Sequence, residues 1–477
     1  MVRLSAELSE KCAVAGVWGS NAAARLTASM LEELQHRGQD GTGIVTWDNE
    51  GELLRHVKLG LVVEAYPEVT LQSLEGRAAI GHNRYATSGS ASDLEHIQPF
   101  ADAKTSWALA HNGNLSVIKS LADFLVSKNM PIELLNDSGM MHAAIGYYLQ
   151  AGSGVVEAVE RVFPLLVGAF SCVALHEEKL VAFRDAYGIR PLSYGKLPGG
   201  GYAVASETRA LDALGATDQT DISPGQLIVF SSAGIETVRI VQSNPKLDIF
   251  ELVYFARGDS RLYGRIVEDV RYDFGVQLAR EQPVGGDTTS TIVVPVPRSA
   301  IPAAEGYARE SGLKYVEGIK RSSRLRTFIK PDQEERRQAV CEKLVPDPTV
   351  LNGKRVVLIE DSIVRGMTLG VLIEMLREAG AAEIHVRISS PPVKFPNFYG
   401  INMPSQAELI AHGRTIEEVC EAIGADSLGY LSVEGMLMAT KCSPESFDVS
   451  VFTGEYPIEI GSHQREITTD KRVALTV

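Results

Sequence analysis

The sequence has few cysteines and no long hydrophobic run, and each shortage excludes a class of protein. Its 477 residues contain five cysteines, at positions 12, 172, 341, 420 and 442. An odd number without a C-x-x-C pair excludes both a disulfide framework and a zinc or redox pair. The longest apolar run, 162–175, is interrupted by proline and glycine and is shorter than the roughly 20 residues of a membrane-spanning helix. Residues 1–11 lack the apolar centre of a secretory signal, so a cytoplasmic protein with no membrane contact is expected.

Positive charge is also in short supply. Lysine and arginine number 46 against 60 acidic residues, and the formal net charge is −14. Nucleic-acid polymers and anionic membranes bind basic surfaces, so neither is an expected partner. Any phosphate site must therefore depend on local positive charge. The length and the hydrophobic content of 45% leave room for two globular domains, each with its own core.

The two halves of the chain differ in hydrophobic rhythm. In residues 12–245, short β-branched runs alternate with Gly and Asn, and the runs 168–175 and 180–183 predict a hairpin. Residues 22–34 and 138–149 carry apolar side chains at helical spacing. This half is therefore predicted to be α+β.

From residue 291 onward, predicted strands and helices alternate. Strands are expected at 291–297, 355–359 and 383–388, and helices at 300–311 and 368–379. Such units predict a doubly wound parallel sheet, whose ligands bind beyond the carboxyl ends of the strands. The loops that follow the first two strands are therefore the predicted binding loops. Residues 448–477 are predicted only as a C-terminal tail.

Cys12 follows a short polar segment and is a candidate nucleophile. If residues 1–11 are a propeptide that is removed, the freed α-amine, with a pKa near 8, can serve as the base for the thiol. Taken alone, a cysteine here is more often an ordinary small residue. The surrounding motifs change that interpretation: they are Cys12-Ala-Val-Ala-Gly16, Leu34-Gln-His-Arg-Gly-Gln39, Gly81-His-Asn-Arg-Tyr-Ala-Thr87, His111-Asn-Gly-Asn-Leu115 and Asn136-Asp-Ser138.

Together these motifs resemble the N-terminal-nucleophile (class II) glutamine amidotransferases, and within them the glutamine phosphoribosylpyrophosphate amidotransferases. The resemblance covers nearly the whole chain. It implies that residues 12–245 form a glutaminase domain with the four-layer sandwich of the N-terminal-nucleophile fold. It also implies that Cys12 is the nucleophile and that Asn112 and the backbone N–H of Gly113 form the oxyanion hole.

The same resemblance assigns the binding of glutamine to two charged residues. Arg84 would hold the α-carboxylate of glutamine and Asp137 its α-ammonium group. Plainer alternatives exist: an Asn-Gly pair such as 112–113 is common in hairpin turns, and Arg84 and Asp137 can form ordinary surface ion pairs.

The loop after the strand 355–359 reads Glu360-Asp-Ser-Ile-Val-Arg-Gly-Met-Thr368. Its backbone N–H groups and the start of the next helix can cradle a phosphate, and its two acids can meet ribose hydroxyls or Mg²⁺. The plain alternative is a helix cap. The loop resembles the phosphoribosyl-pyrophosphate signature of type I phosphoribosyltransferases, which implies an α/β doubly wound domain over residues 246–447.

The resemblance also implies a set of residues that bind phosphoribosyl pyrophosphate. Of these, Ser299, Glu360 and Asp361 are the expected ligands of Mg²⁺. Arg326 and Lys330 lie in a basic segment, 320–337, that resembles the mobile loop of the family. The full set is Arg298, Ser299, Arg326, Lys330, Glu360, Asp361, Ser362, Arg365, Gly366 and Thr368.

Several positions depart from the pattern of the family. Ala13 stands where glycine is usual, Gly258 where proline is usual, Arg298 where an acid is usual and Met367 where threonine is usual. Many members also bind an iron–sulfur cluster through four cysteines. The matching positions here are Asp248, Asn397, Asp448 and Val451, so no cluster is expected.

The resemblance implies an enzyme that hydrolyses glutamine and transfers the ammonia to phosphoribosyl pyrophosphate. The products would be 5-phosphoribosylamine, pyrophosphate and glutamate, in the first committed step of purine synthesis. Inhibition by purine nucleotides and a homo-oligomer are also implied. Two alternatives remain open: a divergent paralogue with an intact glutaminase and a different acceptor, and a regulatory protein that senses nucleotides. Arg298 and Gly258 favour the second alternative, whereas the motifs around Cys12 argue against it.

Overall fold

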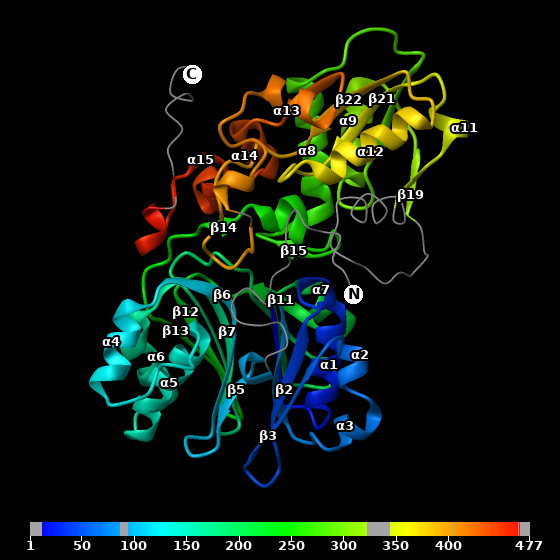
Figure 1. Cartoon of the computed structure of the whole chain (residues 1–477). Helices are drawn as coiled ribbons and strands as arrows, with labels where there is room; N and C mark the ends of the chain where they lie inside the picture. The colour runs from blue at the N-terminus through cyan, green and yellow to red at the C-terminus, as the bar shows by residue number, and fades with distance from the viewer. Residues whose placement is uncertain (1–11, 86–93, 322–343, 404, 466, 468–477) are drawn as a thin grey trace.

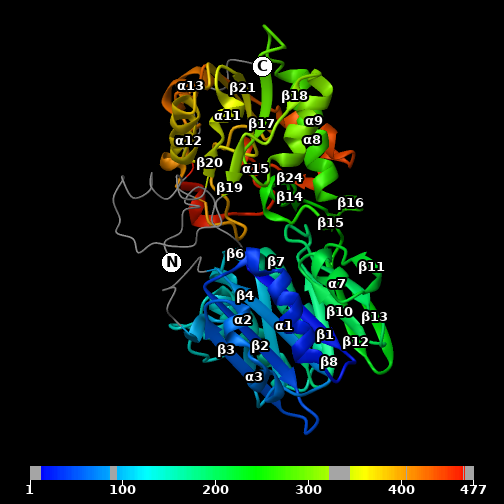
Figure 2. The ribbon, with the colours of Figure 1, turned by 90° about the vertical axis from the view of Figure 1, so that its right-hand side faces the viewer.

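The computed structural model describes residues 12–85, 94–321, 344–403, 405–465 and 467. The described chain forms two bodies, one above the other in Figure 1 and again in the turned view of Figure 2. We call residues 12–239 the N-terminal body and residues 247–465 the C-terminal body.

Two antiparallel sheets face each other in the N-terminal body. The seven-stranded sheet has the order β11-β9-β10-β1-β4-β2-β3, and the six-stranded sheet has the order β13-β12-β8-β7-β6-β5. The strands of the first are β1 (Ala13–Trp18), β2 (Gly41–Trp47), β3 (Leu53–Leu59), β4 (Ala78–Arg84), β9 (Ser193–Lys196), β10 (Tyr202–Ala205) and β11 (Thr217–Asp221). The strands of the second are β5 (Phe100–Asp102), β6 (Trp107–Val117), β7 (Val167–His176), β8 (Lys179–Arg184), β12 (Gln226–Ser231) and β13 (Gly234–Arg239).

Helices cover the outer faces of both sheets. Those against the seven-stranded sheet are α1 (Ala23–Glu33), α2 (Val62–Ala65), α3 (Glu68–Gln72) and α7 (Thr208–Ala213); those against the six-stranded sheet are α4 (Lys119–Ser127), α5 (Asp137–Gln150) and α6 (Val155–Val162).

Successive side chains of a strand point to opposite faces of its sheet, and in this body they build three hydrophobic layers. On β1, Val14 points into the core between the sheets, whereas Ala13 packs in the layer with α1. On β7, Val173 lies between the sheets and Cys172 lies in the layer with α5, as the two-residue period of a strand requires. The predicted four-layer sandwich, the hairpin of β7 and β8 and the two predicted helices are thus confirmed.

A five-stranded parallel sheet of order β18-β17-β21-β22-β23 forms the centre of the C-terminal body. Its strands are β17 (Thr291–Pro295), β18 (Lys314–Tyr315), β21 (Arg355–Glu360), β22 (Glu383–Ile388) and β23 (Ser427–Tyr430). The helices are α8 (Val267–Glu281), α9 (Ile301–Ser311), α11 (Pro348–Leu351), α12 (Met367–Glu378), α13 (Ile416–Ile423), α14 (Val433–Thr440) and α15 (Ser450–Thr453). Three short pairs complete this body: β14 (Leu247–Asp248) with β24 (Phe447–Asp448), β15 (Arg261–Leu262) with β16 (Arg265–Ile266), and β19 (Ile319–Arg321) with β20 (Leu344–Pro346).

Both faces of this parallel sheet are buried. On β21, Val357 packs in the cluster that includes α8, α9 and α14, whereas Val356 packs with α12 and α13 on the other face. Burial on both faces explains why the strands read as continuous hydrophobic runs. The predicted doubly wound sheet is confirmed, and each predicted strand and helix of this half lies within two residues of its expected position.

The segment that follows residue 447, expected only as a tail, packs across the two bodies. The hydroxyl of Tyr399 donates to the carbonyl of Ile458 at 2.6 Å, and Ser116 Oγ on β6 donates to the carbonyl of Glu459, also at 2.6 Å. Residues from both bodies share a small buried cluster with Ile458. The C-terminal segment therefore helps to join the bodies.

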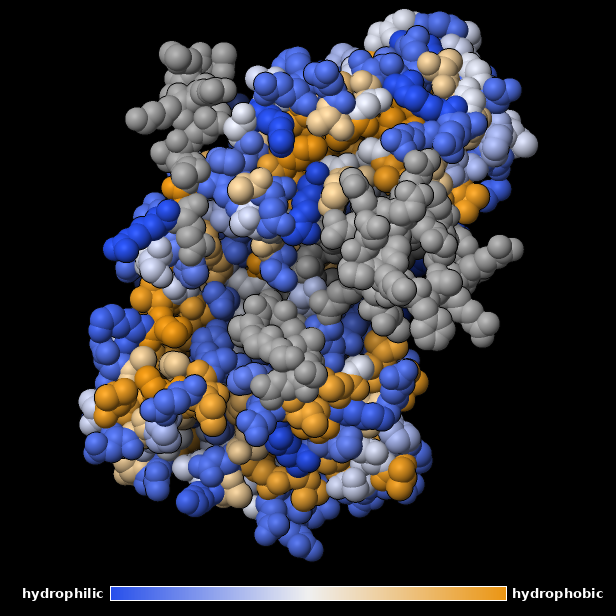
Figure 3. Space-filling model, viewed as in Figure 1, coloured by the Kyte–Doolittle hydropathy of each residue, from blue (hydrophilic) through white to orange (hydrophobic). Residues whose placement is uncertain are grey.

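No helix among the described residues is both long and apolar enough to cross a membrane. The face of the molecule shown in Figure 3 mixes hydrophilic and hydrophobic residues on both bodies. Within the described ranges the four cysteines, at positions 12, 172, 420 and 442, are free thiols.

Two candidate active sites

Cys12 lies directly before β1, the central strand of the seven-stranded sheet. Its Sγ is 3.8 Å from the carbonyl oxygen of Tyr85, which follows β4. Strands β1 and β4 pair with Ala13 opposite Asn83, so the end of β4 with Arg84 lies beside Cys12. The register of the sheet thus brings the candidate nucleophile and a candidate glutamine ligand together.

Several groups act on the Cys12 thiol. Burial raises its pKa above the ordinary value, while the hydrogen bond to the Tyr85 carbonyl and the charges of Arg84 and Arg190 lower it, and the charge of Asp137 raises it. Burial dominates, so the resting group is a thiol rather than a thiolate at neutral pH. A nucleophilic role therefore requires a nearby base.

Asn112 and Gly113 lie inside strand β6, which excludes the hairpin-turn alternative for this pair. Asn112 Nδ2 is 3.5 Å from Ser206 Oγ, which in turn accepts a hydrogen bond from the N–H of Val14 at 2.9 Å. Gly113 has a φ of 150°, and a Cβ there would lie 2.0 Å from the carbonyl oxygen of Ala169. Only glycine fits this position.

Asp137 is the first residue of α5, where the N-terminus of a helix stabilises a carboxylate. Its Oδ1 accepts from the N–H of Ser138 at 2.8 Å and its Oδ2 from the N–H of Leu115 at 3.1 Å. Arg84 is only 4% exposed, which excludes an ordinary surface ion pair for this residue. The bond from Leu115 joins Asp137 to β6, the strand that also carries Asn112 and Gly113.

Sequence reasoning missed a set of buried polar residues behind the site. Gln98 Oε1 accepts from the N–H of His111 at 2.6 Å, and His111 Nδ1 is 2.9 Å from Ser138 Oγ. Ser206, which directly follows β10, links Asn112 to β1. His111 and Ser138 stand within motifs quoted from the sequence, whereas Gln98 and Ser206 carried no sequence signal beyond a polar side chain next to an apolar residue.

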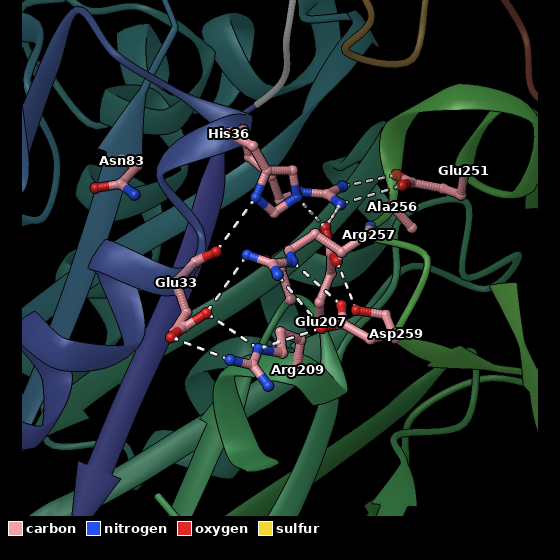
Figure 4. Close-up of polar contacts among 12 residues, drawn as sticks. Glu33, His36, Asn83, Glu207, Arg209, Glu251, Ala256, Arg257 and Asp259 are labelled. Carbon is pink, nitrogen blue, oxygen red and sulfur yellow. Dashed lines mark hydrogen bonds and ion pairs between the residues drawn. The ribbon is translucent and has the colours of Figure 1, made fainter. Parts of the chain in front are cut away.

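A second set of buried polar residues, whose contacts were not predicted, lies where the two bodies meet. Figure 4 shows these contacts around the carboxylate of Glu207, which is fully buried. Its Oε1 pairs with Arg37 Nη1 and with His36 Nε2 at 2.8 Å, and its Oε2 accepts from Ser260 Oγ at 2.7 Å and from the N–H of Arg257 at 2.9 Å. Burial opposes ionisation, but the charges of His36 and Arg37 hold the pKa of Glu207 well below its ordinary value.

The second candidate site lies at the carboxyl ends of β17 and β21. These strands are neighbours, so the loops that follow them meet, as predicted. Ser299 Oγ donates to Asp361 Oδ2, and Ser362 Oγ donates to Asp361 Oδ1 at 2.6 Å. Burial raises the pKa of Asp361, whereas these hydrogen bonds and the charge of Arg271 lower it.

The remaining residues of this loop start helix α12. Gly366 precedes the helix with a φ of 78°, a left-handed conformation that favours glycine. Thr368 lies in the first turn of α12, and Arg365 Nη2 donates to Glu408 Oε1 at 2.8 Å. The loop therefore leads into the N-terminus of α12 in the way that is typical of a phosphate-binding site.

Of the other predicted members of this site, two lie at the ends of the strands and two are outside the described residues. Arg298 is exposed in the loop after β17, and Glu360 is the last residue of β21. Arg326 and Lys330 lie outside the described residues. Within the described ranges, no three His, Cys, Asp or Glu side chains gather to hold a metal ion by themselves.

Three other departures from the expected pattern are at Ala13, Gly258 and Met367. The methyl group of Ala13 is buried in the core with α1. Gly258 does not have a positive φ, and a Cβ there would make only ordinary contact with Glu268. Met367 is 41% exposed in the first turn of α12.

The positions matched to the cluster cysteines are brought together between the bodies. Asp248 and Asp448 face each other in the β14–β24 pair, and Asn397 Nδ2 donates to Asp248 Oδ2 at 3.1 Å. Val451 is buried in the adjacent helix α15. Burial and the charge of Asp248 raise the pKa of Asp448 to about 7.

Comparisons with known proteins match both bodies. Residues 67–239 match the glutamine amidotransferase domain family and residues 277–389 the phosphoribosyl transferase domain family. The amidophosphoribosyltransferase of Mycobacterium tuberculosis is 43% identical over 479 residues, which cover 97% of this chain and 89% of that protein. The Bacillus subtilis amidophosphoribosyltransferase is 38% identical over 465 residues, which cover 95% of each chain.

A solved structure is similar over almost the whole chain. It is the glutamine phosphoribosylpyrophosphate amidotransferase of B. subtilis complexed with ADP and GMP, which is 38% identical with a TM-score of 0.86. The match covers 94% of this chain and 98% of that chain.

Proposed function

The chain belongs to the amidophosphoribosyltransferases, glutamine-dependent glycosyl-transferring enzymes of purine biosynthesis, and we propose how its residues divide that reaction between the two bodies. The N-terminal body hydrolyses glutamine, and the C-terminal body transfers the ammonia to phosphoribosyl pyrophosphate. The near-complete match to curated members supports this enzyme rather than a glutaminase with another acceptor or a nucleotide sensor.

In the N-terminal body, Cys12 acts as the nucleophile once residues 1–11 have been removed. Its free α-amine accepts the thiol proton, and Sγ attacks the side-chain amide carbon of glutamine. The C–N bond breaks, ammonia leaves with the transferred proton, and water hydrolyses the thioester to glutamate. Asn112 and the N–H of Gly113 stabilise the oxyanion of the tetrahedral intermediate.

Arg84 and Asp137 orient the amino-acid end of glutamine. The Arg84 guanidinium pairs with the α-carboxylate, and Asp137 at the start of α5 accepts from the α-ammonium group. Two contacts support this arrangement: the register of β1 and β4 puts Arg84 beside Cys12, and the N–H of Leu115 on β6 donates to Asp137.

In the C-terminal body, ammonia attacks C1 of phosphoribosyl pyrophosphate and pyrophosphate leaves. The loop from Ser362 to Thr368 cradles the 5′-phosphate at the start of α12. Asp361, with its buried carboxylate held by two serine hydroxyls, binds the ribose hydroxyls. Exposed Arg298 contributes positive charge for the pyrophosphate.

The oxygen donors of Ser299, Glu360 and Asp361 suit Mg²⁺, which prefers hard oxygen ligands. Mg²⁺ commonly binds through one or two carboxylates, waters and substrate phosphates, so two acids suffice without a full protein cage. When bound, the ion would neutralise charge on the pyrophosphate. No iron–sulfur cluster is proposed, because the matched positions carry no cysteine, and metal analysis of purified protein would test this.

Ammonia is mostly protonated in bulk water, so it passes between the sites inside the protein. The two bodies touch at β6, the strand that carries Asn112 and Gly113, and this contact supports the route. Asn114 Nδ2 on β6 donates to the carbonyl of Phe398 at 2.9 Å. A Cβ added at Gly400 would lie 2.9 Å from the carbonyl carbon of Gly113.

We propose that purine nucleotides inhibit the enzyme, since the similar B. subtilis structure was complexed with ADP and GMP. We also propose that the enzyme forms a homo-oligomer and is located in the cytoplasm. Sedimentation with and without nucleotide would measure the size of the oligomer and whether nucleotide binding changes it.

The register of β1 and β4, which places Arg84 beside Cys12, is the observation that carries the glutaminase assignment. Its test compares glutamine and ammonium as nitrogen donors in Cys12→Ala. We expect glutamine-dependent formation of phosphoribosylamine to be lost and ammonium-dependent formation to remain. Cys442→Ala, a partly exposed thiol in the C-terminal body, is the matched control. Full glutamine-dependent activity in Cys12→Ala would exclude the mechanism.

A further inference from the structure

The N–H of Gly113, a proposed oxyanion donor, is not held by the neighbouring strand. Gly113 on β6 lies opposite Phe170 on β7. The N–H of Phe170 donates to Asp185 Oδ2 at 3.0 Å, and its carbonyl accepts from the N–H of Asp185 at 2.9 Å. Both groups of Phe170 thus point away from β6, as in a non-hydrogen-bonded pair, and the N–H of Gly113 points away from β7. The direction of this donor must therefore be fixed by other contacts.

A bulge in β6 follows directly after Gly113. The pairing of β6 with β7 shifts between Asn114 and Val117. Inside this shift, the N–H of Leu115 donates to Asp137 Oδ2 at 3.1 Å instead of to a strand. Bulges are common next to active sites, where they redirect side chains. Here the bulge leaves groups of β6 available to partners outside the sheet.

Residues 397–401 of the C-terminal body, which we call the junction loop, lie against this bulge. Asn114 Nδ2 donates to the carbonyl of Phe398 at 2.9 Å. Gly400 has a φ of 104°, and a Cβ there would lie 2.9 Å from the carbonyl carbon, 3.0 Å from the Cα and 3.1 Å from the carbonyl oxygen of Gly113. The backbone of the loop therefore packs directly on Gly113, and the next residue of β6 holds it there.

The junction loop is firmly held in place by its own contacts. Asn397 Oδ1 accepts from the N–H of Tyr399 at 2.8 Å and from the N–H of Ile401 at 3.3 Å. Tyr399 is fully buried. Its hydroxyl donates to the carbonyl of Ile458 at 2.6 Å and accepts from the N–H of Ile458 at 3.0 Å. A loop held at several points can act as a fixed support for the strand that it touches.

We propose that Asn114 is a positioning residue of the glutaminase reaction, which holds the junction loop against Gly113 so that the N–H of Gly113 stays directed at the oxyanion. Asn114 acts through this contact and is not itself an oxyanion donor, because its amide group is bonded to Phe398. The inference rests on the proposed oxyanion hole of Asn112 and Gly113. It makes the geometry of that hole depend on a loop supplied by the other body.

The test compares three properties of Asn114→Ala in the enzyme whose N-terminus is Cys12. We expect kcat for glutamine hydrolysis to fall about 10- to 100-fold, because a misaligned oxyanion donor loses most of its effect. KM for glutamine should change by less than about threefold, since Arg84 and Asp137 still bind the substrate. The rate at which iodoacetamide alkylates Cys12, measured by mass spectrometry of its peptide, should be nearly unchanged, because this displacement forms no oxyanion.

Ser116→Ala is the matched control at the same junction. Ser116 Oγ donates to the carbonyl of Glu459 at 2.6 Å, so this variant also removes one hydrogen bond between β6 and the C-terminal body. Its kcat should stay close to that of the parent enzyme. Asn112→Ala is the positive control, because it removes a proposed oxyanion donor outright and should lower kcat by about 100- to 1,000-fold.

Gly400→Ala keeps the test decisive if circular dichroism shows that Asn114→Ala does not fold. Its added Cβ would push on the backbone of Gly113, so we expect the same loss of kcat without slower alkylation of Cys12. Gly424→Ala is the control for this variant, because Gly424 also has a positive φ but has open space where the Cβ would lie.

The inference is overturned if Asn114→Ala keeps full kcat, or if Ser116→Ala loses as much. A loss that appears in KM rather than kcat, or alkylation that slows together with hydrolysis, would also overturn it. Where Asn114→Ala does not fold, full kcat in Gly400→Ala has the same meaning. Full kcat in Asn112→Ala would instead overturn the proposed oxyanion hole. Loss of kcat in Asn112→Ala but not in Asn114→Ala rejects only the role of Asn114.

Discussion

At the scale of single residues, the chemistry depends on how burial changes each ionisable group. Burial raises the pKa of the Cys12 thiol, so the group does not ionise by itself at neutral pH. Asp361 is buried and is held by two hydroxyl donors. Cys12 needs a base to accept its proton, and Asp361 needs its carboxylate to bind the substrate. Each requirement leads to a prediction.

A retained N-terminal segment should block the glutaminase. With residues 1–11 in place, the amine of Cys12 is part of a peptide bond and cannot accept a proton. A chain that begins at Cys12 should exceed one that keeps the segment by roughly 100-fold in kcat/KM for glutamine, the usual contribution of a general base. Mass spectrometry verifies each N-terminus. Equal activity of the two chains would reject the α-amine as the base.

Asp361→Asn should weaken the binding of phosphoribosyl pyrophosphate by about 10- to 150-fold, as expected for one lost charge-assisted contact of about 1.5–3 kcal/mol. Basal glutamine hydrolysis should change little, because the two sites lie in separate bodies. Titration calorimetry with Mg²⁺ measures the binding, and Glu421→Gln on the exposed side of α13 is the control. Unchanged affinity in Asp361→Asn would remove this residue from the site.

At the scale of elements, strand pairing places groups that the sequence of a single strand does not explain. Strand β6 carries Gly113 with positive φ in tight contact with β7. The two-residue strands β14 and β24 bring Asp248 and Asp448 together. Both features are set by pairing between strands, and each leads to a prediction.

Gly113→Ala should abolish most glutaminase activity while it spares ammonium-dependent synthesis. The added Cβ would lie 2.0 Å from the carbonyl oxygen of Ala169, so β6 must shift away from β7 and carry Asn112 with it. Steady-state assays with the two nitrogen donors measure the split. Gly154→Ala serves as the control, because that position has open space and a negative φ. A fully active Gly113→Ala would show that the strand tolerates the shift.

Asp448 should make stability fall as the pH rises. Its folded pKa of about 7 lies above its ordinary value of 3.8, so the folded state retains the proton longer than the unfolded state. Stability is therefore lost between about pH 4 and pH 7, and the full loss persists above pH 7. Asp448→Asn removes this penalty and should raise Tm at pH 8 by roughly 5 °C, with a smaller gain at pH 5.

Thermal unfolding of Asp448→Asn at both pH values checks this expectation. The exposed Asp123→Asn in α4 is the control. A gain that is equal at pH 5 and pH 8 would contradict the assigned titration.

At the scale of the whole molecule, buried charge joins the two bodies. Glu207 of the N-terminal body binds the backbone and side chains of residues 257–260 in the other body, as Figure 4 shows. Glu33 and Arg209 form a more exposed pair beside it. Loss of one partner from a buried pair is far more costly than loss of a partly exposed pair.

Glu207→Gln should therefore lower Tm by roughly 5–10 °C, since it leaves the Arg37 charge short of a buried partner, at a cost of about 3–5 kcal/mol. Glu33→Gln, in the exposed pair of the same junction, should change Tm by less than about 2 °C. Differential scanning calorimetry of both variants measures the contrast. Similar Tm values for the two would show that the buried network does not hold the bodies together.

Much of this organisation could be predicted from the sequence. Hydrophobic periods of two and 3.6 residues are local, so they identified the elements near Gly168, Ala300 and Thr368 without tertiary information. The motifs around Cys12 and Asp361 are likewise short segments, and they indicated both candidate sites and the fold of each half.

The tertiary structure alone decided which distant polar residues meet. No motif or hydrophobic period indicates the partners of Arg190 and Glu207, and residues 448–477 are predicted only as a tail, because no local pattern records a partner far along the chain. Arg37 and Glu251 pair across a separation of 214 residues. Such pairs depend on how packed bodies exclude water from charges, a cost that exists only after the sheets and helices have assembled.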